Sequence, residues 1–293
     1  MIQSQKVIFN PQQSSISKKA VEVEIADLRK ITEVVKNRYG YDFSDYAKSS
    51  FRRRIQRIIE IFQFNSTKEV ITRLENDPSF INTFLAEVTV NVTEMFRDPS
   101  FWREARDNII PNLFLNHETV NIWHAGCSSG EEVMSMCIML KEMDILHKAN
   151  IIATDIDKPI LEKAKKSRVP IKNMVLNEKN YIRFQGQKTL SHYYEEKDGM
   201  AIIDPTLFAG VSYRNFDLVK GDVFNKFDLI LCRNVMIYFN QNLQNRVLKK
   251  LHESLFKYSY LAVGSKESLI WCEIANKFII VNNEEKVYKK IKD

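Results

Sequence analysis

A glycine-bounded turn followed by two acids is the part of this sequence best suited to chemistry. The turn runs from Gly126 to Gly130, after the apolar segment 120–125 and before a helical pattern that begins at Glu131. Glycines let the backbone approach a ligand closely, and a helix N-terminus offers free N–H groups. The pattern predicts a strand, a tight turn and a helix that together bind an adenosine-containing cofactor.

The turn differs from the dinucleotide-binding pattern because Ser128 stands where the middle glycine is expected. In dinucleotide enzymes that glycine lets the backbone approach a pyrophosphate. Glu131 and Glu132 follow at once, and they would repel a phosphate at the helix N-terminus. They suit a cofactor with a cationic amino acid end. The turn therefore disfavours NAD, and the absence of Gly-Lys-Ser/Thr excludes a P-loop.

An acid at the end of the next apolar strand is the expected ligand of a cofactor ribose. Asp155 follows Gly130 by 25 positions, close to the spacing of about 20 seen in dinucleotide folds. The alternative is that Asp155 and Asp157 only cap the helix that begins near Pro159. We favour the ribose role for Asp155 and the capping role for Asp157. His124, at the end of the strand before the turn, is interpreted as structural.

Strands and helices alternate after residue 119, and this alternation must position the turn. Near-continuous apolar strands between helices predict a parallel sheet covered on both faces. Two C-terminal segments flank a polar turn and predict a closing antiparallel hairpin. This combination is typical of adenosylmethionine-dependent methyltransferases. The expected strands are 120–125, 150–154, 227–232 and 260–263, the helices are 131–143, 159–166 and 243–255, and the hairpin is 278–281 with 286–291.

The chain divides into four expected segments. Residues 1–17 are polar and predict a flexible tail, whereas residues 18–95 repeat apolar side chains at helical spacing and predict a small all-helical domain. Residues 96–118 form a linker and a helix, Phe101 to Ile110, that ends before Pro111. Residues 119–293 form the α/β domain. Within them, residues 171 to about 215 fit no strand–helix repeat and predict an inserted subdomain.

Composition limits the class of protein. The 293 residues are 44% hydrophobic and 27% charged, as in soluble proteins with a proper core. No stretch approaches the ~20 apolar residues of a membrane span, and no signal peptide is visible. We expect a cytoplasmic protein without direct membrane insertion. Four cysteines without a C-x-x-C pair predict neither disulfides nor a metal site, and a net charge of +6 does not by itself indicate nucleic acid.

Three segments together resemble one family, the CheR-type chemotaxis receptor methyltransferases. Residues 91–98 resemble the family's N-x-T-x-x-F-R segment, and residues 125–132 resemble its cofactor turn. Residues 227–239 resemble its long F-D-x-I-x-C-R-N-V-x-I-Y-F strand. The resemblance runs from about residue 25 to 290. It implies a helical domain followed in the chain by a Rossmann-like methyltransferase domain. The implied activity is that of an S-adenosylmethionine-dependent protein-glutamate O-methyltransferase, with S-adenosylhomocysteine as product and no metal.

The resemblance also assigns roles to single residues. Arg97 and Tyr238 are the implied catalytic groups on the substrate side. Glu131 is implied to bind the methionine end of the cofactor and Asp155 its ribose. The implied cofactor contacts are Asn91, Thr93, Arg97, Gly126, Glu131, Asp155, Asp217, Leu218, Arg233 and Asn234.

The sequence departs from the family pattern near the turn and near the C-terminus. Val133-Met134 stands where Pro-Tyr is usual, which puts one aromatic contact with the cofactor in question. Residues 264–269 stand where Gly-His-Ser-Glu is common, so the role of that segment stays open.

The implied reaction needs no general base. A glutamate carboxylate, with a pKa of about 4.3, is already ionised at neutral pH. Charge disappears as sulfonium and carboxylate combine, so a tight ion pair would stabilise the ground state more than the transition state. We expect Arg97 to orient the carboxylate and Tyr238 to donate a neutral hydrogen bond. The alternative for Tyr238 is a buried structural tyrosine.

A basic helix in the N-terminal domain is the expected docking site for substrate. Arg53 and Arg57 lie one turn apart and share a face. The alternative is an ordinary solvated face. The resemblance favours docking of acidic chemoreceptor cytoplasmic helices by a monomeric enzyme, with no nucleic acid partner. Two other functions stay open: a methyltransferase of the same fold with another protein, RNA or small-molecule acceptor, and a non-catalytic cofactor-sensing adaptor.

Overall fold

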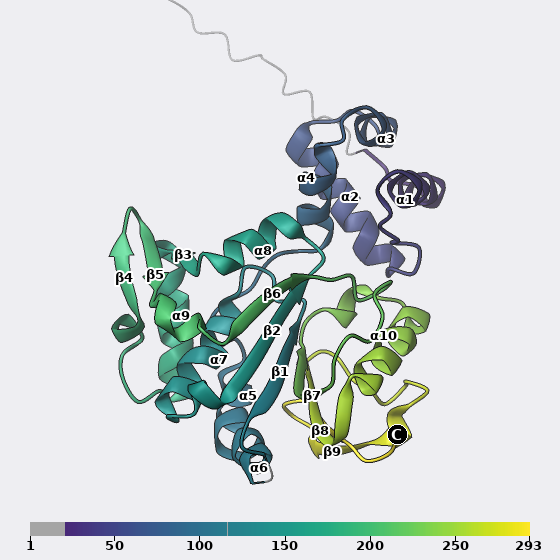
Figure 1. The fold of residues 1–293 in the computed structure, drawn as a ribbon. Helices are drawn as coiled ribbons and strands as arrows, with labels where there is room; N and C mark the ends of the chain where they lie inside the picture. Colours follow the sequence, from purple (N-terminus) through teal and green to yellow (C-terminus); the bar gives the residue numbers. More distant parts are fainter. Residues whose placement is uncertain (1–20, 116) are drawn as a thin grey trace, which may run out of the picture.

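The computed structural model describes residues 21–115 and 117–293, so the tail expected at residues 1–17 lies outside it. The first part of the described chain is a helical lobe with an apolar core of its own, which includes Ile31, Ile55 and Phe84. Figure 1 shows this lobe set on one end of the larger α/β domain. Its helices within the described residues are α1 (Ile25–Tyr39), α2 (Lys48–Phe62), α3 (Thr67–Asn76) and α4 (Phe80–Val88).

A bent helix follows the linker and corrects one prediction. Helix α5 (Pro99–Glu104) continues through a π-helical turn (Ala105–Ile109) into α6 (Ile110–Phe114), so Pro111 does not end the helix. A π-helical turn shifts the hydrogen-bond pairing to i→i+5 and opens the helix. Pro111 follows this π-helical turn directly, and the altered pairing there accommodates its missing N–H inside the continuing helix.

The α/β domain is built on one large sheet, as predicted. In the described chain its order is β6-β2-β1-β7-β8-β10-β9. The first five strands run parallel, and β10 and β9 add an antiparallel hairpin. The strands are β1 (Val120–Ala125), β2 (Ala149–Asp155), β6 (Val211–Asn215), β7 (Phe227–Cys232), β8 (Leu255–Val263), β9 (Phe278–Asn282) and β10 (Val287–Lys290).

Alternate residues of the central strands feed two cores, one on each face of the sheet. Leu229 and Leu231 point to the core beneath α7 (Glu131–Glu142). Ile230 points to the opposite core, which the apolar side of α10 (Gln241–Glu253) covers. Helix α8 (Lys158–Lys165) packs beside β2 and β6 at the edge of the sheet. Burial on both faces explains why the central strands are apolar at most positions.

A small antiparallel sheet with its own helix forms the inserted subdomain. Its order is β3-β5-β4, from β3 (Arg168–Pro170), β5 (Met200–Ile203) and β4 (Tyr194–Lys197), and α9 (Ile171–Phe184) packs on it. The predicted range of 171–215 is wrong at both ends. The insertion begins with β3, and residues 211–215 are strand β6 of the main sheet. Single turns of 3-10 helix connect elements at Leu146–Lys148, Leu190–Tyr193, Pro205–Phe208, Met236–Tyr238 and Ala275–Lys277.

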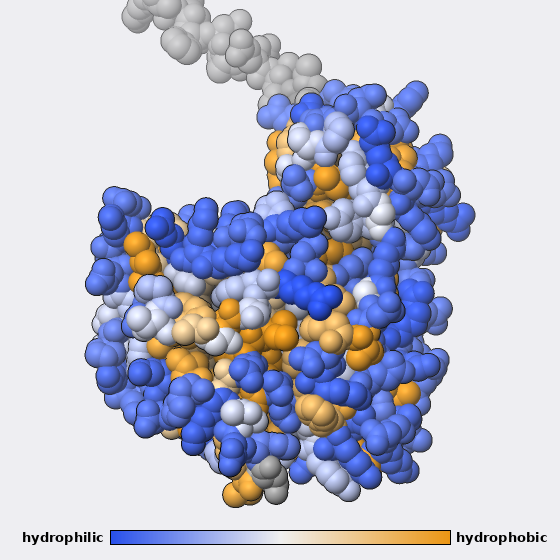
Figure 2. Space-filling model, in the orientation of Figure 1, coloured by the Kyte–Doolittle hydropathy of each residue, from blue (hydrophilic) through white to orange (hydrophobic). Residues whose placement is uncertain are grey.

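The helical lobe is joined to the α/β domain by specific contacts at the start of α10. The Asp45 carboxylate forms an ion pair with Arg246 at 2.6 Å. The backbone carbonyl oxygen of Asp45 accepts a hydrogen bond from the Asn240 N–H at 2.9 Å. The Ala47 N–H donates to the carbonyl oxygen of Tyr238 at 2.9 Å. Figure 2 shows the lobe projecting from the body, with an open notch beside it.

Across the described helices, none has both the length and the apolar character that a bilayer crossing requires.

Candidate active site

One pocket lies at the carboxyl ends of β1, β2 and β7, where an open parallel sheet usually binds its ligand. Its space, including the part open to solvent, is about 970 Å³. The linker from Thr89 to Arg97 covers it, and the helical lobe contributes Tyr46 to its wall. The other lining residues are Trp102, Gly126, Cys127, Ser128, Glu132, Asp155, Ile156, Phe216, Asp217, Leu218, Val219, Arg233, Asn234, Val235, Tyr238 and Phe239.

The predicted turn forms the floor of this pocket. The N–H groups of Gly126 and Cys127 both donate to the carbonyl oxygen of Thr154, at 2.8 and 2.9 Å, which folds the turn against β2. Gly126 has a φ of +81°, and a Cβ there would lie 2.6 Å from a methyl group of Val235. Only glycine fits this position, because a side chain would be strained and would collide with the opposite wall.

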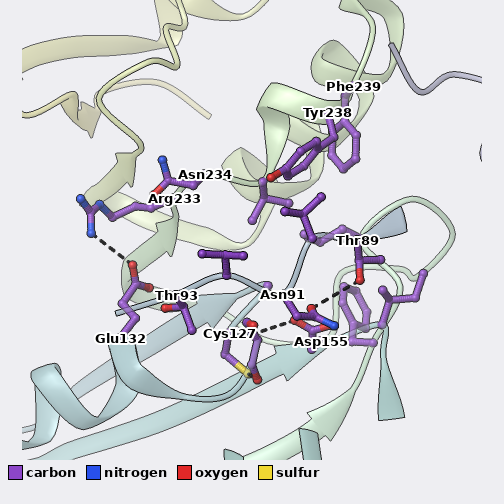
Figure 3. A pocket seen from close by; sticks show the side chains of 18 of the residues that line it. Thr89, Asn91, Thr93, Cys127, Glu132, Asp155, Arg233, Asn234, Tyr238 and Phe239 are labelled. Atoms are coloured by element: carbon purple, nitrogen blue, oxygen red, sulfur yellow. Dashed lines mark hydrogen bonds and ion pairs between the residues drawn. The ribbon is translucent and has the colours of Figure 1, made fainter. Parts of the chain in front are cut away.

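Asp155 lies at the end of β2, facing the pocket. Its carboxylate accepts the Ser128 N–H at 2.8 Å and the Asp157 N–H at 3.0 Å, so it is fixed against the turn. Burial raises the pKa of Asp155 to about 6, although these hydrogen bonds lower it. A carboxylate at this place suits two ribose hydroxyls. Figure 3 shows Asp155 and Asn91 on one side of the pocket and Tyr238 on the facing side.

Asp157 has the capping role expected of it and a second contact to the linker. Its carboxylate accepts the Ile160 N–H at 3.2 Å as N-cap of α8. The Asn91 side chain donates to the other oxygen of that carboxylate at 2.8 Å. Asn91 therefore lines the pocket while it also ties the linker to the end of β2.

The two acids after the turn separate into different environments. Glu131 does not line the pocket: it is buried in the helix start and accepts a hydrogen bond from the Ser129 hydroxyl at 2.7 Å. Glu132 lies on the pocket wall instead. Neighbouring helical residues point about 100° apart, so the helix can present only one of the two acids to the pocket. The structure thus places Glu132 in the pocket wall and Glu131 behind the turn, and the contact of Glu131 with the methionine end of the cofactor stays a prediction.

Arg233 joins the linker to the first turn of α7. Its guanidinium, whose side chain is 2% exposed, pairs with Asp98 at 2.7 Å and with Glu132 at 3.3 Å. It also stacks over the ring of Phe101 at 4.1 Å. Glu132 in turn contacts His124 Nδ1 at 2.8 Å, which gives His124 the structural role expected of it. Arg233 lines the pocket, but its charge is already used to hold the linker over the turn.

Arg97 and Tyr238, the two residues implied to be catalytic, both line the pocket. The carbonyl oxygen of Arg97 accepts the Trp102 indole N–H at 3.0 Å, which fixes the backbone where the guanidinium leaves it. Among the described residues, none forms a hydrogen bond or ion pair with that guanidinium. Burial raises the pKa of Tyr238, while the charges of Arg54, Arg97 and Arg53 lower it. The Tyr238 phenol is therefore neutral at physiological pH and lies within the field of three arginines.

A buried carboxylate supports the loop that carries Asn234 and Tyr238. Glu267 is 5% exposed and accepts the N–H groups of Asn234 at 2.9 Å, Ile237 at 3.1 Å and Gly264. Burial raises its pKa, and these hydrogen bonds oppose that effect. A Cβ on Gly264 would lie 2.8 Å from that carboxylate and 2.6 Å from the Asn234 amide. The segment 264–269, whose role the sequence left open, thus holds the pocket loop from behind.

The far end of the pocket is apolar and aromatic. Phe216, Asp217 and Leu218 line it after β6, and the Phe216 N–H donates to the carbonyl oxygen of Asp155 at 3.0 Å. This wall suits the flat face of an adenine. Sequence reasoning did not predict that aromatic residues such as Tyr46, Phe216 and Phe239 line the pocket.

The arginines of α2 are divided between an ion pair and the pocket entrance. Arg57, predicted to dock substrate, pairs with Glu87 at 2.8 Å. Arg53 is exposed and lies near Tyr238, as does Arg54, which the sequence analysis did not single out.

The pocket fits S-adenosylmethionine by its shape and its donor set. Asp155 matches a ribose, Glu132 adds negative charge near the cationic end, and the buried Ser128 hydroxyl has no partner among the described residues. The altered pair Val133-Met134 is buried in α7 away from the pocket, so this departure does not touch the ligand wall. In the parts of the chain that the structure describes, no three potential metal-binding side chains gather.

Comparison with known proteins decides the family. The description "CheR methyltransferase, all-alpha domain" matches residues 26–89, and "CheR methyltransferase, SAM binding domain" matches residues 91–287. This chain belongs to the CheR methyltransferase family. Its cofactor is therefore S-adenosylmethionine, and its helical lobe and sheet correspond to the family's two domains.

Relatives of known name support this membership over nearly the whole chain. A Pseudomonas putida protein named Cher3 is 34% identical over 264 residues, which cover 90% of this chain and 96% of the relative. A chemotaxis protein methyltransferase of Listeria innocua is 30% identical, covering 84% of this chain and 93% of the relative. One of Borreliella burgdorferi is also 30% identical, covering 83% and 88%.

Proposed function

We propose that this CheR-family enzyme transfers a methyl group from S-adenosylmethionine to glutamate carboxylates of chemoreceptor cytoplasmic helices. The products are glutamate methyl esters and S-adenosylhomocysteine, formed for adaptation in chemotaxis. The observation that carries this proposal is that Arg97 and Tyr238 lie in the wall of one pocket, close enough for the charge of Arg97 to act on the phenol. An uncommitted guanidinium beside a neutral phenol suits an incoming carboxylate better than an amine or an aromatic base.

The proposed chemistry depends on position more than on proton transfer. S-adenosylmethionine supplies an electrophilic methyl group on its sulfonium. Arg97 holds the acceptor carboxylate in line with that group, and Tyr238 donates a hydrogen bond to the same carboxylate. Because charge is neutralised as the ester forms, exclusion of water by the linker supplies part of the rate.

The cofactor end of the site is held by residues that do not react. Asp155 is proposed to bind the ribose, with Asp217 and Leu218 beside the adenine and Thr93 and Asn91 in the covering linker. Arg233 keeps that linker closed through Asp98 and Glu132. Binding of the donor and orientation of the acceptor are thus assigned to different segments of the chain.

The acceptor is proposed to be acidic and helical because basic residues of α2 border the entrance. Arg53 and Arg54 lie close enough to Tyr238 to lower its pKa. An acidic helix laid along α2 would bring its glutamates toward Arg97. We propose a monomeric cytoplasmic enzyme that meets receptors at their cytoplasmic helices, without nucleic acid.

The direct test incubates the protein with methyl-labelled S-adenosylmethionine and receptor-containing membranes. We expect base-labile label on the receptor band, as a carboxyl methyl ester requires. Parallel reactions with receptor-free membranes, soluble protein extract and total RNA are the controls. Label on RNA or on a soluble protein alone would contradict the proposed acceptor. Cofactor binding without any transfer would instead favour a non-catalytic sensor.

A further inference from the structure

The helical lobe places one side chain, Tyr46, in the wall of the cofactor pocket. Tyr46 ends the loop between α1 and α2, and its ring packs edge-on against Phe43 at 4.8 Å and Phe239 at 5.2 Å. Tyr46 and Phe239 also form an isolated antiparallel bridge. One ring thus comes from the core of the lobe and the other from the pocket loop, so the position of Tyr46 is fixed from both domains.

The surroundings of the phenol are acidic. Burial raises the pKa of Tyr46, and the charges of Asp217 and Asp155 raise it further, ahead of a smaller effect of Tyr238. The hydroxyl is therefore a neutral donor that lies near both acids. Within the described chain no residue accepts its hydrogen or donates to its oxygen. The hydroxyl is not among the buried unpaired atoms of the described chain, so it is open to the pocket. A ligand that displaces water from the pocket must offer this donor a new hydrogen-bond partner, or binding loses free energy.

The geometry points to Tyr46 as a further cofactor-binding residue, which hydrogen-bonds the adenosine half of S-adenosylmethionine. The two acids whose charges act on the phenol, Asp217 and Asp155, line the part of the pocket assigned to adenine and ribose. Glu132 and Arg233 mark the opposite end, and Figure 3 shows them away from Phe239, which Tyr46 contacts. This inference rests on the assignment of the pocket to S-adenosylmethionine.

A role for Tyr46 makes the helical lobe part of the cofactor site as well as a docking surface. A neutral hydroxyl on the adenosine half does not distinguish a sulfonium from a thioether. Loss of the Tyr46 hydroxyl should therefore lower the affinity for S-adenosylmethionine and the affinity for S-adenosylhomocysteine by the same factor.

The test compares Tyr46→Phe in the full-length protein with Tyr258→Phe, whose side chain is on the surface of β8 and 59% exposed. Isothermal calorimetry with each of the two cofactors gives the dissociation constants. We expect Tyr46→Phe to raise both dissociation constants by about three- to tenfold, as the loss of one hydrogen bond predicts. Tyr258→Phe should bind as the unchanged protein does.

Separate results would overturn the inference and the assignment beneath it. Equal affinity of Tyr46→Phe and the unchanged protein for both cofactors would remove Tyr46 from the site. Unchanged affinity with a lower kcat would move Tyr46 to the acceptor side, which also contradicts the inference. Failure of the unchanged protein to bind S-adenosylhomocysteine would instead refute the assignment of the pocket. Melting curves for both variants check that the single hydroxyl deletions leave the fold intact.

Discussion

At the scale of single residues, Asp155 links cofactor binding to pH. Burial raises its pKa to about 6, so the folded protein holds this proton more tightly than the unfolded chain. This group's contribution to stability is therefore fully present below about pH 4 and is lost as pH rises through about 6. The ionised form, which destabilises the fold, is the form that can accept hydrogen bonds from ribose.

Affinity for S-adenosylhomocysteine should consequently rise as pH increases from about 5 to 7. At about pH 5 only about a tenth of Asp155 is ionised, so binding should be up to tenfold weaker than at neutral pH. Calorimetry across this range measures the effect. Asp155→Asn should bind weakly at every pH and flatten the profile. A profile of the same slope in Asp155→Asn would show that another group is responsible.

The variant Arg97→Ala tests whether binding of the methyl donor and orientation of the acceptor carboxylate depend on different residues. Because no described residue pairs with its guanidinium, Arg97→Ala should leave the fold intact. It should lower kcat for receptor methylation by about a hundredfold, as misplacement of a reacting group does, and change S-adenosylhomocysteine affinity by less than about threefold. Steady-state kinetics and calorimetry give both values, with Arg168→Ala on β3 as the matched surface control. Loss of cofactor binding with unchanged turnover per bound cofactor would refute the assigned role.

At the scale of elements, Glu267 supports the loop from Asn234 to Tyr238. Glu267→Ala leaves N–H groups of Asn234, Ile237 and Gly264 without their acceptor. Each buried unpaired group costs about 1–3 kcal/mol, so the free energy of unfolding should fall by about 3 kcal/mol or more. Urea denaturation measures this loss. Glu284→Ala, in the exposed hairpin turn, should change it by less than about 0.5 kcal/mol. Equal stability of the two variants would contradict the supporting role.

Periodicity predicted the large elements because their burial is a local property of the sequence. Strand β7 is apolar at nearly every position, and its bounds agree with the prediction of 227–232. Strand β6 was missed because it lies at the sheet edge and alternates partly exposed residues, without an apolar run. The different surroundings of Glu131 and Glu132 could not be predicted, because a helix start does not reveal in sequence which of two adjacent residues lines a pocket.

At the scale of the whole molecule, two domains meet at one entrance. Such contacts depend on docking between distant segments, so sequence could not predict Tyr46 as part of the cofactor wall. Arg53 and Arg57 followed from helical spacing, but the ion pair of Arg57 with Glu87 joins residues thirty positions apart. The family resemblance named residues of the pocket. Only the fold showed which of them form hydrogen bonds or ion pairs with other parts of the chain, as Arg233 does with Asp98 and Glu132.

Charge reversal on α2 tests the docking surface. Arg53→Glu with Arg57→Glu should lower receptor methylation by about five- to tenfold at low salt and less at high salt, because exposed charges are screened. Affinity for S-adenosylhomocysteine should not change. Lys141→Glu with Lys148→Glu makes the same change in charge at the amino end of the sheet and is the matched control. Equal rates for the two double variants at low salt would rule out docking by this face.

The central claim is that the pocket delivers a methyl group to a glutamate carboxylate of a receptor. Tandem mass spectrometry of receptor peptides after reaction with S-adenosylmethionine tests it most directly. The account predicts methyl esters on glutamate side chains within the cytoplasmic helices, removable by mild base and nearly absent with Arg97→Ala. Methyl groups found only on nitrogen or sulfur atoms, or on receptor glutamates equally with Arg97→Ala, would contradict it.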